Sequence, residues 1–234
     1  LKYVNDSISA IFEIDVSRTS DDVLVLMHDK TLERTTTGIN ALIDYSFQEL
    51  QGLNLVDDFG NETNFKIPKF VDVLRWAVDN EVILTVDTKR GVDITKIIAM
   101  IEQEKAVGVA IIITYDVAQA LQVFELNPNL LLSVSARNLE ELNRLMDSDI
   151  PTQNMLAFTG TRLSPILFYE KLHELGVKTI LGTLGNLDKM AAAKGDSLYM
   201  NWRKLGVDVI ATDRPFEAAR VLSYSEHHQI ESLY

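Results

Sequence analysis

Short apolar runs recur along most of the chain at intervals of about 20 to 30 residues. Each run has four or five nearly continuous apolar residues, which is typical of a strand buried on both faces. Amphipathic segments of helical length, such as Ile94–Glu104 and Leu139–Asp147, lie between the runs. This alternation predicts a parallel sheet that is covered by helices. The expected strands are Val82–Val86, Val109–Ile113, Leu130–Val134, Met155–Phe158, Val177–Leu181 and Val207–Ala211.

The first third of the chain follows a less regular pattern. Ile11–Val16 is a further expected strand, and Val23–Met27 is another after a polar turn. Residues 29–68 carry mixed turn signals, and only Ser46–Leu53 within them has a helical pattern with a capping box. A helix is then predicted from Lys69 to Asp79.

Counting the strands favours one fold class without excluding another. Ile11–Val16 and the six later runs give seven core strands, one fewer than an eight-stranded (β/α) barrel needs. A doubly wound open sheet would have the same alternation of strands and helices. We expect an α/β TIM barrel, with residues 1–234 as a single domain, its first strand before Leu1 and residues 29–68 as an insertion. Val23–Met27 would be an extra strand that leads into this insertion.

Acidic residues in the expected strand Ile11–Val16 suggest metal binding. Glu13 and Asp15 are two positions apart, so they point to the same face with their Cα atoms roughly 7 Å apart. Two carboxylates on one face of a buried strand are costly unless a positive group lies between them. A divalent cation such as calcium or magnesium prefers oxygen ligands of this kind. An edge strand with two solvated acids is the alternative interpretation.

In a barrel of this class the chemistry gathers at the C-terminal ends of the strands. Asp87 lies at such an end and could complete a three-carboxylate metal site with Glu13 and Asp15. Lys89, two positions further on, could bind a phosphate oxygen, although Asp87 and Lys89 could also form only a local ion pair. His28 is a candidate general acid or base near neutral pH, with a surface histidine as the alternative.

Composition limits the range of partners. The formal net charge of −12 argues against nucleic acid and anionic membrane surfaces. A bound metal and a few basic groups could still attract a small anionic substrate. The chain has no cysteine, which excludes a disulfide, a thiolate metal site and a cysteine nucleophile. No apolar run reaches the length of a membrane span, so no integral membrane segment is expected.

The segment FEIDVSRTSDDVLVLMHDKTLERTTTG resembles the signature of the glycerophosphodiester phosphodiesterase family. Family members have Glu-x-Asp on the second barrel strand, then His-Asp, and then a Thr-Leu-x-Arg-Thr-Thr-x-Gly run. Further along, IPKFVDVL resembles the return of the family's insertion to the barrel, and GVDVIATDRP resembles its last strand. The counterparts of the three N-terminal motifs are Glu13/Asp15, His28/Asp29 and Thr31–Gly38.

The resemblance implies a metal-dependent enzyme that hydrolyses glycerophosphodiesters to an alcohol and sn-glycerol 3-phosphate. Its cofactor would be a divalent cation, calcium or magnesium, and its partner a small phosphodiester. Two histidines share the acid and base work in the family, and the second is the one present here. The resemblance favours a periplasmic or secreted location over a cytoplasmic one. The implied site residues are Glu13, Asp15 and Asp87 for the metal, His28 for catalysis, and Lys89 and Arg34 for the substrate.

The chain departs from the family pattern at three places. The first histidine of the family, in a His-Arg-Gly motif, has no counterpart in the 234 residues. His173, His227 and His228 do not match that motif, and we interpret them as structural or solvated. The third acid is Asp87 where many members have glutamate. The expected strand seven also lacks the tryptophan motif of many members, and we interpret Trp202 as a packing residue.

Three other functions agree with parts of the sequence. A sphingomyelinase D-like phospholipase shares the barrel and has an aspartate as third ligand, but the Thr-Leu-x-Arg-Thr-Thr run favours the first family. A barrel that binds metal or phosphate without turnover agrees with the missing histidine motif. An aldolase-like barrel would use Lys89 as a Schiff-base lysine.

Overall fold

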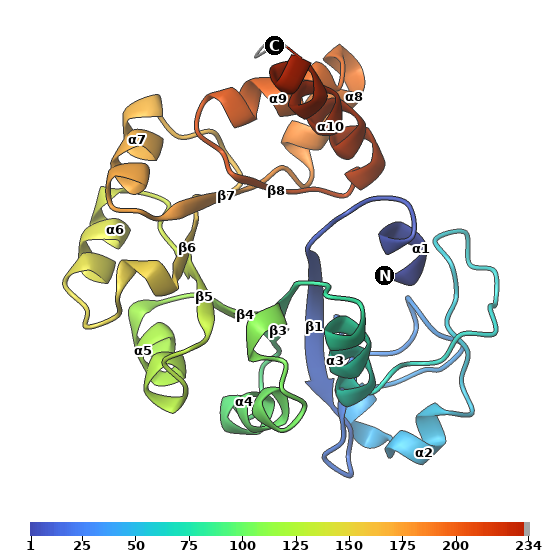
Figure 1. Ribbon diagram of the computed structural model, residues 1–234. Coiled ribbons are helices and arrows are strands. Elements are labelled where there is room, and N and C mark those ends of the chain that lie inside the picture. Colours follow the sequence, from blue (N-terminus) through green and yellow to red (C-terminus); the bar gives the residue numbers. More distant parts are fainter. Residues whose placement is uncertain (232–234) are drawn as a thin grey trace. The chain divides into compact units, whose positions relative to one another are not determined.

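The structure is a computed structural model that describes residues 1–231, with side chains described as far as residue 223. Two compact units are present, one of Ile11–Ile113 and the other of Leu1–Ala10 with Thr114–Tyr234. Both are built from mostly parallel strands and the helices that connect them (Figure 1). None of the helices in the described part of the chain is long and apolar enough to span a membrane.

The unit Ile11–Ile113 has its strands in the order β2-β1-β3-β4. The β1–β2 pair is antiparallel, and the β1–β3 and β3–β4 pairs are parallel. Its strands are β1 (Phe12–Arg18), β2 (Leu24–Leu26), β3 (Leu84–Thr88) and β4 (Ala110–Thr114). Its α-helices are α2 (Phe47–Leu50), α3 (Phe70–Asp79) and α4 (Ile94–Gln103), and its 3₁₀ turns are η1 (Leu42–Asp44) and η2 (Val107–Val109).

Alternation along β1 decides which side chains reach the core. Ile14 and Val16 are buried, whereas Glu13 and Asp15 point to the opposite face. The helix α3 follows its amphipathic pattern and buries Phe70 and Leu74. The register of the parallel β1–β3 pair then places Asp15 directly beside Asp87.

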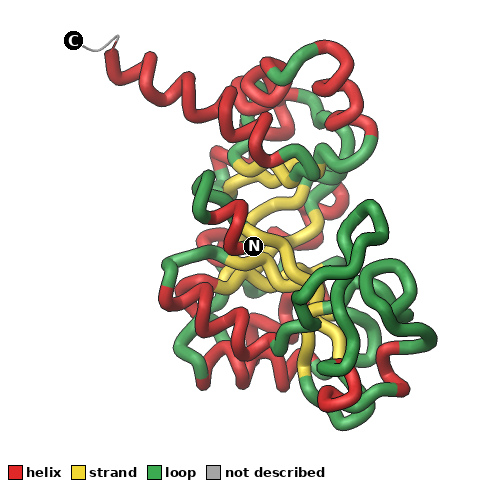
Figure 2. Tube along the Cα trace, turned by 90° about the vertical axis from the view of Figure 1, so that its right-hand side faces the viewer, coloured by secondary structure: helices red, strands yellow, loops and turns green. Residues whose placement is uncertain are grey.

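Residues 29–68 form long loops with little regular structure, drawn mainly in green in Figure 2. The predicted capping box is present, because the Ser46 hydroxyl accepts from Glu49 N and the Glu49 carboxylate accepts from Ser46 N. The helix is only the turn Phe47–Leu50, shorter than expected, since Gly52 disfavours a further helical turn. These loops enclose an apolar cluster of Val25, Met27, Leu32, Leu42, Leu50 and Ile67.

The second unit has its strands in the order β5-β6-β7-β8, with the β5–β6, β6–β7 and β7–β8 pairs parallel. In Figure 1 the helices α5 to α9 follow this sheet, in yellow-green to red. The strands are β5 (Leu131–Ser135), β6 (Met155–Phe158), β7 (Lys178–Gly182) and β8 (Val209–Ala211). The helices are α1 (Lys2–Asn5), α5 (Val117–Leu126), α6 (Leu139–Met146), η3 (Thr152–Asn154), α7 (Ile166–Glu174), α8 (Asn186–Lys194), α9 (Ser197–Lys204) and α10 (Pro215–Glu231).

All eight strands predicted from the sequence are present, with bounds that agree to within two residues. Trp202 is buried and packs edge-on against Tyr199, with ring centroids 5.2 Å apart, so its interpretation as a packing residue is confirmed. The side chains of His227 and His228 lie outside the described residues.

His173 has a structural partner, as expected. Its Nε2 lies 2.9 Å from Asp208 Oδ2, and the same oxygen accepts a hydrogen bond from Thr179 N at 2.8 Å. Partial burial works to raise the pKa of Asp208, but these hydrogen bonds outweigh it and hold the pKa below its usual range. The ionised carboxylate therefore joins α7, β7 and the start of β8.

We expect Asp208→Asn to destabilise the protein by about 1–2 kcal/mol near neutral pH, because charge-assisted hydrogen bonds are lost. A depressed pKa gives stability above the unfolded-state pKa, near 3.9, that is lost as the pH falls through the lower folded-state value. The difference in free energy of unfolding between variant and wild type should therefore shrink below about pH 4. Urea denaturation at pH 7 and pH 3.5 measures it, and an equal difference at both values would contradict a role for the charge.

Candidate active site

Three carboxylates meet on one face of the β1–β3 pair. Glu13 and Asp15 share a face of β1 because side chains alternate along a strand, and the register brings Asp87 of β3 beside Asp15. One carboxylate oxygen from each residue lies within 4.8 Å of the other two. These three oxygens could hold a metal ion, as expected from the sequence, and hard divalent cations prefer such ligands.

The electrostatics of the cluster favour a bound cation. Asp87 is buried and the side chain of Asp15 is only 16% exposed, so water screens their charges weakly. Partial desolvation, together with the negative charges of Asp15 and Asp87, raises the pKa of Glu13 to about 7. A cation between the three groups would favour the ionised form of Glu13, so the donor set fits a divalent metal.

Lys89 spans the two aspartates. Its Nζ lies 2.5 Å from Asp15 Oδ1 and 2.8 Å from Asp87 Oδ2. Partial burial works to lower the pKa of Lys89, but the hydrogen bonds to the two carboxylates outweigh it and raise the pKa. The side chain is therefore a firmly protonated ammonium. One positive charge faces three carboxylates, so the cluster keeps negative charge that a metal could balance.

His28 lies just after β2, and the backbone fixes this strand end to β1. Met27 N donates to Asp15 O at 3.0 Å, and the Ser17 hydroxyl donates to Met27 O at 2.8 Å. His28 thus directly follows Met27, whose backbone is hydrogen-bonded to β1. The His28 side chain is 64% exposed, so its ring is open to a ligand from solution.

Asp29 links His28 to Arg34. The Nδ1 atom of His28 lies 2.6 Å from Asp29 Oδ1, while Arg34 donates from Nε to Asp29 Oδ2 at 2.5 Å and from Nη2 to Oδ1 at 2.9 Å. The pKa of Asp29 lies well below its usual range, chiefly because of the Arg34 hydrogen bond and then that of His28. A separate role for Asp29 was not predicted from the sequence, although its place beside His28 was a usable signal.

Solved structures confirm the fold class. A glycerophosphoryl diester phosphodiesterase from Parabacteroides distasonis is 34% identical to this chain, with a TM-score of 0.87 over 94% of this chain and 77% of its own. A phosphodiesterase from Oleispira antarctica is 17% identical, with a TM-score of 0.75 over 95% and 87%. The chain has the α/β fold of mostly parallel strands found in TIM-barrel phosphodiesterases.

Sequence relatives identify the family. The model of the glycerophosphoryl diester phosphodiesterase family matches residues 10–157, and this chain belongs to that family. Glycerophosphodiester phosphodiesterase 1 of Bos taurus is 35% identical over 83 residues, which are 33% of this chain and 24% of the relative. A glycerophosphodiester phosphodiesterase of Caldanaerobacter subterraneus is 31% identical over 81 residues, 34% of this chain and 33% of the relative. These matches thus span only a quarter to a third of the curated relatives.

Removing one carboxylate from the cluster should weaken metal binding. We expect Glu13→Gln to bind calcium or magnesium at least about tenfold more weakly, because the amide brings no charge to the ion. Isothermal titration calorimetry with each metal chloride measures the affinity. Glu125→Gln, which removes one charge from the exposed face of α5, is the matched control and should bind like wild type. Unchanged affinity in Glu13→Gln would contradict a metal site here.

Proposed function

We propose that the protein hydrolyses glycerophosphodiesters to an alcohol and sn-glycerol 3-phosphate, using a divalent cation, calcium or magnesium, at Glu13, Asp15 and Asp87. The observation that carries the proposal is the convergence of these three carboxylates with Lys89, in a chain of this family. The Oleispira antarctica phosphodiesterase, which has the same fold, was solved in complex with the product sn-glycerol-3-phosphate. The partner expected here is accordingly a small phosphodiester.

The proposed chemistry assigns charge stabilisation to the face of β1 and β3. A bound divalent cation would act as a Lewis acid that stabilises negative charge on the phosphate oxygens. Lys89 adds an ammonium that is already oriented by Asp15 and Asp87, so it can donate to a phosphate oxygen without a large loss of conformational freedom. Hydrogen bonds to these two aspartates hold the amine protonated, which disfavours the Schiff-base alternative.

His28 is the proposed general acid. Hydrolysis forms a bond between phosphorus and the oxygen of a water molecule, which loses a proton, and breaks the bond between phosphorus and the oxygen of the leaving alcohol, which gains one. The Nδ1 atom of His28 is engaged by Asp29, so the proton would come from Nε2 of the doubly protonated ring, which is left as the neutral ring protonated at Nδ1. The exposure of the ring agrees with a group that meets a soluble substrate.

Two alternatives keep support from particular residues. Asp87 as third acid agrees with a sphingomyelinase D-like phospholipase. A barrel that binds metal or phosphate without turnover would use the same three carboxylates and Lys89. Release of glycerol 3-phosphate from glycerophosphodiesters, measured by coupling to glycerol-3-phosphate dehydrogenase, separates the three. Turnover of sphingomyelin alone would support the phospholipase, and metal binding without any turnover would support the binding protein.

We expect His28→Ala to lower kcat by about 10²-fold or more while leaving metal affinity unchanged, because a general acid is lost and the carboxylates remain. The coupled assay measures kcat, and calorimetry measures metal affinity. His173→Ala removes the imidazole that pairs with Asp208 and should keep wild-type kcat. Full turnover in His28→Ala would remove His28 from the mechanism.

Chelation should abolish turnover reversibly. We expect an excess of EDTA to reduce the rate to background, and added calcium or magnesium to restore it, because three carboxylates and one ammonium leave the site negatively charged without a metal. The coupling enzyme must be tested separately in EDTA. A rate that is unaffected by the chelator would contradict metal dependence.

A further inference from the structure

We propose that Arg34 is a positioning residue that orients His28 by way of Asp29. The run Thr31–Gly38 is the scaffold that holds Arg34 in place. The inference rests on the proposed function, because it concerns how the general acid is oriented. It also gives Arg34 a different role from the substrate binding that the family resemblance implies.

The guanidinium fixes the plane of the Asp29 carboxylate. Arg34 donates to both carboxylate oxygens, from Nε to Oδ2 and from Nη2 to Oδ1. Two parallel hydrogen bonds between planar groups define their relative orientation, whereas a single bond would leave the carboxylate free to rotate. Asp29 Oδ1 is thereby held in one direction, and this oxygen is the one that lies 2.6 Å from His28 Nδ1.

A fixed Asp29 decides which nitrogen of His28 reacts. The nitrogen that donates to a strong acceptor keeps its proton, so Nδ1 stays protonated toward Asp29, and Nε2 is the nitrogen that carries the second proton of the imidazolium and gives it up. The ring is largely exposed, and in the described part of the chain Asp29 is the only recorded hydrogen-bond partner of the His28 side chain. Little else therefore restricts rotation of the ring.

Buried residues on both sides of Arg34 hold it toward Asp29. Leu32 is fully buried, and its carbonyl accepts from both Thr36 N at 3.0 Å and Thr36 Oγ1 at 2.7 Å. The Thr36 hydroxyl also accepts from Gly38 N at 2.9 Å, which closes the turn. A Cβ at Gly38 would lie 2.6 Å from Leu53 Cδ1, so a side chain at this position would require Leu53 to shift. The residues of the run Thr31–Gly38 are therefore explained by the packing and hydrogen bonds of the loop, without any contact to substrate.

The contacts also disfavour a direct role of Arg34 on phosphate. Two of its three nitrogens are engaged by Asp29, whose carboxylate balances the guanidinium charge. Lys89 is the cation that lies with the acidic cluster. An arginine that oriented a general acid would affect kcat, while an arginine that bound the ground-state substrate would affect KM.

The test compares Arg34→Gln and Arg34→Lys with wild type on glycerophosphodiesters. We expect Arg34→Gln to lower kcat about tenfold with KM within about twofold, by analogy with the lower end of the loss found when partners that orient metal-binding histidines are removed. Arg34→Lys should fall between Arg34→Gln and wild type, because lysine keeps the charge but cannot form the two-pronged contact. Thermal unfolding of both variants checks that they are folded.

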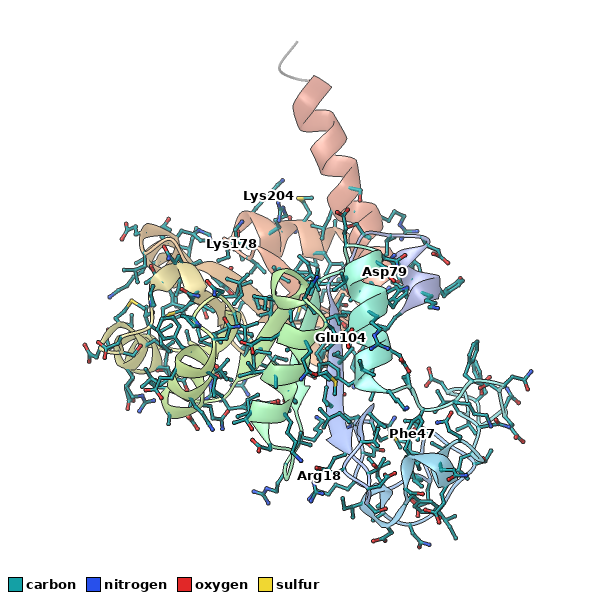
Figure 3. All side chains as sticks on the ribbon, turned by 60° about the horizontal axis from the view of Figure 1, so that its bottom comes forward. Arg18, Phe47, Asp79, Glu104, Lys178 and Lys204 are labelled. Atoms are coloured by element: carbon teal, nitrogen blue, oxygen red, sulfur yellow. The ribbon has the colours of Figure 1, made fainter. Side chains whose placement is uncertain are left out.

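The chain offers a matched control. Arg75 on α3 makes the same two-pronged contact with Glu104, which follows α4, with both hydrogen bonds at 2.8 Å. The side chain of Arg75 is 58% exposed and that of Arg34 is 63% exposed. Glu104 is labelled in Figure 3, beside α3. Arg75→Gln should therefore leave kcat and KM at wild-type values, since this pair lies outside the proposed machinery.

A measurement without turnover separates this inference from the proposed function. Nitrogen-15 NMR of the imidazoles, with His28 assigned by loss of its signals in His28→Asn, should find the Nδ1-protonated tautomer in wild type and a mixture in Arg34→Gln. A rise of KM with unchanged kcat and unchanged tautomer in Arg34→Gln would overturn the inference and leave the function standing. The expected tautomer change in a protein that hydrolyses no diester would support the positioning role while overturning the function.

Discussion

Repulsion among three carboxylates is the interaction on which this site depends. The register of the β1–β3 pair sets Asp15 beside Asp87, and the alternation of β1 adds Glu13 on the same face. Such an arrangement is unfavourable by itself, and desolvation together with the charges of Asp15 and Asp87 raises the pKa of Glu13. Lys89 relieves part of it through hydrogen bonds to both aspartates. The negative charge that Lys89 does not balance makes this face suitable for a cation, and the bound cation then makes it suitable for a phosphate.

The loops of residues 29–68 support the site through their buried core. An apolar cluster that includes Met27, Leu32 and Ile67 lies inside them, although they have little regular structure. This core fixes the run that carries Arg34, and Met27 N bonds directly to Asp15 O on β1. An exposed histidine can therefore have a defined orientation, because its neighbours on both sides are anchored to buried structure.

A global charge of −12 and an anionic substrate are compatible for a local reason. Electrostatic energy at a partly buried site depends on the nearest charges, because more distant charges on the surface are screened within about 10 Å. At the acidic cluster those nearest charges are the carboxylates, the ammonium of Lys89 and any bound cation. The proposed activity needs only this local balance to be favourable.

The amino-acid sequence by itself determined the strands, the fold class and the family. Near-continuous apolar runs are local signals that indicate strands. Residue types at short spacing, such as Glu13 with Asp15, are sufficient to recognise the family motif. The tertiary structure decided which distant residues meet. Strand register joined Asp15 to Asp87, a meeting that the strand ends had only made possible, and the fold of the insertion turned Arg34 toward Asp29, where the family resemblance had implied a substrate contact. Such contacts depend on long-range packing, which no local pattern of residues encodes.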